Sequence, residues 1–161
     1  MDSMEALREA RSLLESVTPL KTDCGRVCGG ACCQCDEDGQ GGMLLFPGEE
    51  KLYDGSLPAG FSLTESRELG IKCLLLTCEG HCGRKDRPLS CRLFPLLPTE
   101  NGAVLDRRGW AVCPLMEYGR QGLNPEFVGA VQAAGQLLYA CPEHAAFLNA
   151  IHAYNRQLSA L

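Results

Sequence analysis

Five cysteines fall within twelve residues in the stretch Asp23-Cys24-Gly25-Arg26-Val27-Cys28-Gly29-Gly30-Ala31-Cys32-Cys33-Gln34-Cys35. Short loops between cysteines let several sulfurs converge on one centre at little cost in loop-closure entropy. The glycines accept positive φ angles and let backbone N–H groups point at the sulfurs. Cysteines used as small apolar core residues would explain one or two of these positions, but not five. The stretch therefore predicts an irregular centre that is organised by a bound metal ion or cluster.

A second group of cysteines occupies the middle of the chain, at Cys73, Cys78, Cys82 and Cys91, and is followed by Cys113. The two groups together supply enough sulfurs for eight ligand positions, twice the four of a tetrahedral site. Sulfur-only donor sets favour zinc or iron–sulfur centres and disfavour calcium and magnesium. Two metal ions, or one cluster with spare thiols, both fit this count.

The composition indicates one globular domain in a reducing compartment. The chain has 161 residues, of which 45% are hydrophobic and 22% are charged, and it contains 11 cysteines. Residues 1–17 carry charges throughout and lack the unbroken apolar stretch of a secretory signal. That absence and the odd cysteine count argue against a disulfide framework and predict a cytoplasmic protein. No run of 18 apolar residues is present, so no membrane span is expected.

Charge is unevenly distributed along the chain. Residues 34–71 contain eight acidic and two basic side chains, whereas residues 81–113 contain six basic and three acidic ones. A basic cluster can mark a nucleic-acid surface, but the isoelectric point near 5.2 and the lack of a long basic face argue against it. The basic residues lie among cysteines, where arginines can offset thiolate charge. A metal-stabilised interaction module that uses Arg84, Lys85, Arg107 and Arg108 stays open as an alternative.

Apolar spacing and turn residues predict an α+β fold with short strands. A helix is expected over 2–17, with Leu7, Ala10, Leu14 and Val17 on its apolar face. Two further helices are expected from Asn124-Pro125 and from Pro142, forming a C-terminal helical hairpin. The remaining expectations are strands near 43–46, 61–65 and 70–76, a short helix from Pro47, and extended or irregular chain over 88–97. A β-hairpin is expected around Asn101-Gly102, and His144 and His152 are expected to be surface or packing residues rather than ligands.

The domain organisation follows from these elements. We predict a single domain over 1–161, with an N-terminal helix in 1–18 and a helical hairpin in 122–161. Between them lies a small, irregular, metal-organised core in 21–115. This Gly-rich centre has few apolar residues to fold around, so the metal is expected to contribute folding free energy.

Both cysteine groups resemble the YkgJ-type cysteine-cluster family. The resemblance lies in Cys24, Cys28, Cys32 and Cys33, then Cys73, Cys82, Arg87-Pro88, Cys91-Arg92 and Phe94-Pro95. Members are described as zinc- or iron-chelating domains with about eight shared cysteines. The run R-P-x-x-C-R-x-F-P is the most specific part, whereas the three-residue spacers of this chain replace the two-residue spacers usual in the family.

The resemblance and the cysteine count together define the candidate site. The predicted metal ligands are Cys24, Cys28, Cys32, Cys33, Cys73, Cys82, Cys91 and Cys113. Arg87 and Arg92 are expected to support the bound cofactor, zinc or an iron–sulfur cluster, by offsetting charge and donating hydrogen bonds to sulfur. Cys35, Cys78 and Cys141 are expected to be spare thiols.

The predicted function is chelation of zinc or iron through these thiolates. The pattern also resembles the iron–sulfur cysteine set of flagellin lysine methylases, which implies an iron–sulfur enzyme of redox or methyl-transfer type as an alternative. No catalytic residue is predicted, and whether the chain is an enzyme is left open. The expected partner is the metal ion or cluster, and the sequence names no protein partner.

Overall fold

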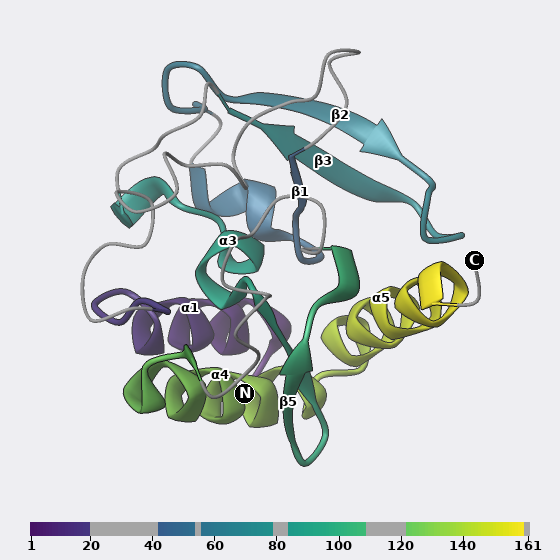
Figure 1. The fold of residues 1–161 in the computed structure, drawn as a ribbon. Coiled ribbons are helices and arrows are strands. Elements are labelled where there is room, and N and C mark those ends of the chain that lie inside the picture. The colour runs from purple at the N-terminus through teal and green to yellow at the C-terminus, as the bar shows by residue number, and fades with distance from the viewer. Residues whose placement is uncertain (20–41, 54–55, 79–83, 109–121, 160–161) are drawn as a thin grey trace.

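Four α-helices and two small antiparallel sheets form the part of the chain that the computed structural model describes, which comprises residues 1–19, 42–53, 56–78, 84–108 and 122–159. The mixed α+β class with short strands, an N-terminal helix and C-terminal helices is as predicted. Figure 1 shows the three-stranded sheet over one side of the molecule and helices α1 (Ser3–Leu13) and α4 (Pro125–Tyr139) on the opposite side. The short helix α3 (Leu89–Leu93) lies between them.

Helix α1 begins with a capping box. The Asp2 side chain accepts a hydrogen bond from the Glu5 amide, and the Glu5 side chain accepts one from the Asp2 amide. The helix ends at Leu13, earlier than the predicted limit of Val17. In a longer helix the Glu15 amide would donate to the Arg11 carbonyl, but it donates to the Ser12 carbonyl. The Arg11 carbonyl instead accepts hydrogen bonds from the Leu14 amide and the Arg92 guanidinium.

The larger sheet has the strand order β1-β3-β2, with both pairings antiparallel. Its strands are β1 (Met43–Leu44), β2 (Ser62–Ser66) and β3 (Cys73–Thr77), each in a region where a strand was predicted. The predicted short helix after Pro47 is the 3-10 helix η2 (Glu49–Tyr53), and a second one, η3 (Arg84–Asp86), precedes α3. Leu44 and Leu76 are buried on this sheet.

Helix α3 corrects the prediction that residues 88–97 are irregular. The prolines at 88 and 95 bracket enough residues for one helical turn, in which the Arg92 amide donates to the Pro88 carbonyl. Pro88 lies just before the helix, in extended geometry, and Pro95 lies just after its end at Phe94. Neither proline therefore removes a hydrogen bond from within the helix.

The predicted β-hairpin is present, with its turn placed differently. Strands β4 (Leu96–Thr99) and β5 (Gly102–Leu105) pair with Thr99 opposite Gly102, so Glu100 and Asn101 form the two-residue loop. Gly102 is already part of β5. The Asn-Gly signal thus located the hairpin correctly but shifted its loop by one residue.

The C-terminal helices complete the core. Helix α4 begins as predicted, with Asn124 capping the Glu126 amide, and helix α5 (Pro142–Ser159) follows. The predicted apolar face of α4 is fully buried, and Gly135 lets this helix approach β4 closely. A Cβ at Gly135 would lie 2.7 Å from the Pro98 Cβ, which is inside van der Waals contact. The core joins α1, α3, α4 and α5 through residues such as Leu7, Ala10, Leu14, Leu93, Phe127, Val131, Leu138, Phe147 and Ile151.

Candidate functional site

The predicted metal ligands divide between described and undescribed parts of the chain. Cys73 and Cys91 are described, whereas the other six lie outside the described residues: Cys24, Cys28, Cys32, Cys33, Cys82 and Cys113. Among the described residues, no three His, Cys, Asp or Glu side chains are grouped as a metal site would require. A metal site that includes Cys73 or Cys91 therefore needs further ligands from outside the described residues.

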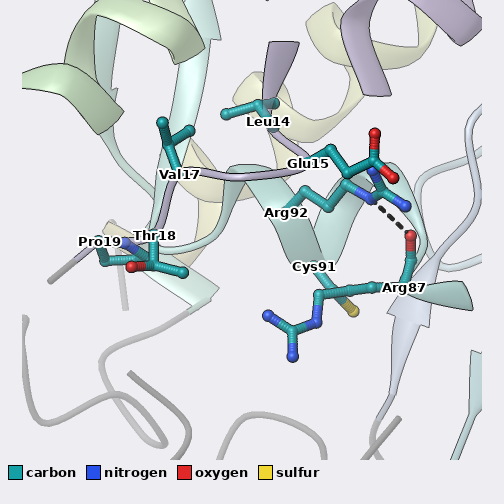
Figure 2. Close-up of a pocket in the computed structure, with 8 residues that line it drawn as sticks. All are labelled: Leu14, Glu15, Val17, Thr18, Pro19, Arg87, Cys91 and Arg92. Carbon is teal, nitrogen blue, oxygen red and sulfur yellow. Dashed lines mark hydrogen bonds between the residues drawn. The ribbon is translucent and has the colours of Figure 1, made fainter. Parts of the chain in front are cut away.

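Cys91 lies in helix α3, half-buried, beside a small cavity of about 20 Å³ (Figure 2). That volume can hold one water-sized group. The cavity is lined by α3 and by the segment that follows α1: Leu14, Glu15, Val17, Thr18, Pro19, Arg87, Cys91 and Arg92. Figure 2 shows the Arg92 guanidinium directed at the Arg87 carbonyl oxygen, away from the Cys91 sulfur, while the Arg87 side chain passes beside Cys91. Cys91 and the predicted charge-offsetting residue Arg87 are thus brought together.

The Arg92 guanidinium is directed at backbone carbonyls. Its Nε atom lies 2.8 Å from the Arg87 carbonyl oxygen, and its Nη atoms lie 2.9 Å from that of Arg11 and 3.2 Å from that of Lys85. Burial, and then the nearby Arg11 charge, lower the pKa of Arg92 from its ordinary value. These bonds tie α3 to η3 and to the C-terminal end of α1, where a cation also interacts favourably with the helix dipole. A role for Arg92 beside sulfur stays a prediction.

A buried ion pair lies next to this arginine. Arg11 Nη1 is 2.6 Å from Glu49 Oε2, and the Glu49 side chain has no exposed surface. The same oxygen accepts from the Leu89 amide at 2.7 Å, while Oε1 accepts from the Phe46 amide at 3.2 Å. Arg11 also donates to the Lys85 carbonyl at 3.4 Å. Helix α1, η2, η3 and α3 are therefore joined by one set of polar contacts.

Tyr53 extends the same network. Its hydroxyl donates to the Asp86 carbonyl at 2.8 Å, which links η2 to η3. Burial, followed by the Glu49 charge, raises the pKa of Tyr53 to about 12. The hydroxyl is therefore a proton donor throughout the physiological range. Sequence reasoning missed Arg11, Glu49 and Tyr53, because Glu49 lies in an acidic segment and Arg11 on a charged helix face, both typical of solvated surface.

Cys73 occupies a different environment. It begins β3, is buried, and lines a cavity of about 310 Å³ with Leu45, Phe46 and Phe147 among the other lining residues. Burial, and then the Glu68 charge, raise the pKa of the Cys73 thiol. This cavity and the cavity beside Cys91 have no lining residue in common. The structure therefore does not bring Cys73 and Cys91 into one pocket.

Cys78 lies at the other end of the same strand. Five residues of extended chain separate it from Cys73, which corresponds to roughly 17 Å along a strand. Cys78 is half-buried and immediately precedes residues 79–83, which contain the predicted ligand Cys82. Cys78, a predicted spare thiol, therefore lies nearer in the chain to Cys82 than the predicted ligand Cys73 does.

The C-terminal cysteine and histidines have packing environments. Cys141 is buried between α4 and α5, with its sulfur 4.0 Å from the Asp2 carbonyl oxygen. His144 Nε2 lies 2.8 Å from the Ser3 carbonyl oxygen, and its ring packs edge-on against Phe46. His152 Nε2 lies 2.8 Å from the Pro98 carbonyl oxygen. Packing roles for both histidines are as predicted, since each ring is bonded to a backbone carbonyl.

Comparisons with protein-family models, curated proteins and solved structures found no match to this chain. The YkgJ-type resemblance therefore stays a prediction from the cysteine and arginine motifs. None of the helices in the described ranges is both long and apolar enough to cross a membrane.

Proposed function

We propose that this protein binds zinc or an iron–sulfur cluster through its clustered cysteine thiolates. The observation that carries the proposal is that Cys91 and Pro19 line the same small cavity. Cys24 follows Pro19 by five residues, and five residues of extended chain span at most about 18 Å. The length of the chain therefore allows the first cysteine group to reach the Cys91 sulfur.

The second cysteine group begins within reach of the same place. Arg92 donates to the Lys85 carbonyl, so η3 lies against the helix that carries Cys91. Cys82 precedes Arg84 by two residues, a span of at most about 7 Å. Chain length thus allows Cys82, Cys91 and the first group to share one centre. The proposed ligand set remains Cys24, Cys28, Cys32, Cys33, Cys73, Cys82, Cys91 and Cys113.

The charges around Cys91 suit a thiolate centre. A four-thiolate zinc site carries a net negative charge, and the neighbouring Arg87 can offset part of it. Sulfur-only ligation selects zinc or iron–sulfur and leaves the choice between them to experiment. We place the protein in the cytoplasm, where thiols stay reduced and available as ligands.

The test is metal analysis with an absorption spectrum of protein purified without oxygen. Zinc gives a colourless protein because its d shell is full, whereas an iron–sulfur cluster gives broad visible absorption. Cys91→Ser is expected to lower metal content and thermal stability together, because ligand loss removes folding free energy. Cys141→Ser is the matched control, and it should leave the metal content unchanged.

Two outcomes would contradict the proposal. A wild-type chain that is fully folded, metal-free and thiol-reactive would exclude it. Equal metal loss in Cys91→Ser and Cys141→Ser would show that the division into ligand and spare thiols is wrong. A colourless protein that holds zinc alone would remove the cofactor on which the redox and methyl-transfer alternative depends.

A further inference from the structure

Glu49 is a buried carboxylate whose two oxygens accept hydrogen bonds from three separate segments. The donors are the Arg11 guanidinium on α1, the Phe46 amide after β1 and the Leu89 amide on α3. Carboxylates without exposed surface are rare in proteins and are paired when they occur. Glu49 is not part of the cysteine pattern. Its role is therefore inferred from the segments that its hydrogen bonds hold together.

The contact with the Leu89 amide bears directly on helix α3. The first amides of a helix have no intrahelical acceptor, and the residue at the cap position, Pro88, provides no side-chain hydrogen bond. Glu49 supplies the missing acceptor from 40 residues away, at 2.7 Å. A five-residue helix has little stability of its own, so its position depends on such external contacts.

Both neighbours of Cys91 are fixed to other segments. The Ser90 hydroxyl donates to the Leu44 carbonyl, and the Arg92 guanidinium donates to the carbonyls of Arg11 and Lys85. Glu49 contacts the segments to which both neighbours of Cys91 are bonded. It pairs with Arg11, and it accepts a hydrogen bond from the Phe46 amide, which follows β1. The direction of the Cys91 side chain is thus set by a network whose central acid is Glu49.

We propose that Glu49 is the positioning residue that holds the thiol of Cys91, a proposed metal ligand, in its orientation. Glu49 acts through the Leu89 amide and Arg11, and it is not itself one of the proposed ligands. This inference deepens the proposed function. Its expected effect on metal affinity rests on that function, whereas the positioning of Cys91 does not. The loosening of α3 itself can be measured on the protein as purified, with or without bound metal.

The experiment uses the full chain, purified without oxygen and with any metal that it holds, with the variants Glu49→Gln and Glu50→Gln. Iodoacetamide labelling at each cysteine is followed by mass spectrometry of the peptides. Loosening of α3 in Glu49→Gln should raise the labelling rate of Cys91 about tenfold relative to wild type, because local opening governs access to a half-buried thiol. Cys141, buried between α4 and α5, serves as the internal reference and should keep its rate. Glu50→Gln, one residue away, should change neither rate.

The ratio of the two rates separates positioning from general destabilisation. A purely structural role would raise the Cys91 and Cys141 rates together, and that result would overturn the proposal, as would an unchanged Cys91 rate. If Glu49→Gln does not fold, the same comparison of Cys91 and Cys141 labelling rates is made with the milder variant Glu49→Asp. It keeps the charge but shortens the reach, and it should raise the Cys91 rate about threefold.

Zinc titration of the same proteins tests the link to metal binding. Glu49→Gln should bind zinc about tenfold more weakly than wild type, while Glu50→Gln should match wild type. A wild-type chain that takes up no metal, combined with a selective change at Cys91, would refute the proposed function and still support the positioning role. An unaltered zinc affinity in Glu49→Gln, with metal bound by wild type, would overturn the role in positioning a ligand.

Discussion

Two buried carboxylates, Glu49 and Asp106, are each paired with an arginine at 2.6 Å, but their surroundings differ. Asp106 accepts from the backbone and the guanidinium of Arg108, two residues away, and from the Asn155 side chain at 3.2 Å. Glu49 accepts from groups on three segments, the farthest 40 residues along the chain. Glu49 accepts from two elements that are distant in sequence, α1 and α3, whereas Asp106 has one distant partner, Asn155 at 49 residues, beside its local partner Arg108.

Each of the two carboxylates is connected to a different cysteine-containing part of the chain. Asp106 and Arg108 lie directly before residues 109–121, which contain the predicted ligand Cys113. Glu49 anchors α3, which carries Cys91, and lies close to η3, which follows Cys82 in sequence. Buried polar contacts thus occur where the chain enters or leaves the cysteine-rich parts, whereas α4 is held mainly by apolar packing. The comparison predicts that losing Glu49 has the wider effect.

Glu49→Ala should cause the largest loss of stability. Its removal takes the carboxylate acceptor away from the Arg11 guanidinium and the Leu89 amide, and it removes one of the negative charges that favour the charged form of Arg92. Breaking a buried pair by removing one partner costs about 3–5 kcal/mol. Urea unfolding followed by circular dichroism measures the change. A loss below about 1 kcal/mol would show that Glu49 contributes no more than an ordinary surface ion pair.

Asp106→Ala should cost less, about 1–3 kcal/mol, because it leaves fewer backbone donors without an acceptor than the loss of Glu49 does. Asp106 accepts from one backbone amide, that of Arg108, whereas Glu49 accepts from the buried amides of Phe46 and Leu89. The remaining cost comes from the buried Asn155 amide, which loses an acceptor. Urea unfolding followed by circular dichroism gives the free energy of unfolding of both variants, so the two losses can be compared directly. A larger loss for Asp106→Ala than for Glu49→Ala would reverse the ranking that their partners imply.

The sequence predicted most helices of this fold, because their signals are local. The spacing of Leu7, Ala10 and Leu14 defines the apolar face of α1. Asn124-Pro125 marks a helix start, and the spacing of Phe127, Val131 and Leu138 defines a buried face. Helix α3 was missed because its first amide is satisfied by Glu49, 40 residues away. An acceptor at that separation leaves no trace in a local pattern.

The candidate site was predictable only in part, for a similar reason. The cysteine spacing identifies which thiols are available, and in the structure Cys91 and Arg87 line the same cavity. The separation of Cys73 from Cys91 depends on how β3 is oriented in the sheet, which residue spacing does not reveal. The Arg11, Glu49 and Tyr53 contacts also join segments that are distant in sequence, so only the folded chain exposes them.

Tyr53→Phe should have the smallest effect of the three, and one that depends on pH. At neutral pH the variant loses the hydrogen bond to the Asp86 carbonyl, which is worth about 1 kcal/mol. In wild type, burial and then the Glu49 charge raise the pKa of Tyr53 to about 12 from its ordinary value of 10.0. The folded protein therefore holds this proton more tightly than the unfolded chain does, and linkage makes stability depend on pH in that range.

The sign of the dependence follows directly. The contribution of the protonated Tyr53 is fully present below pH 10 and is lost as the pH rises toward 12, because the unfolded chain releases the proton first. Tyr53→Phe has no such proton, so the stability advantage of wild type over the variant should narrow as the pH passes 10 and reverse as it approaches 12. Urea unfolding of both proteins at pH 8, 10 and 11.5 measures it. A difference that stays constant would mean that the hydroxyl titrates alike in the folded and unfolded chains, and that Glu49 does not act on it.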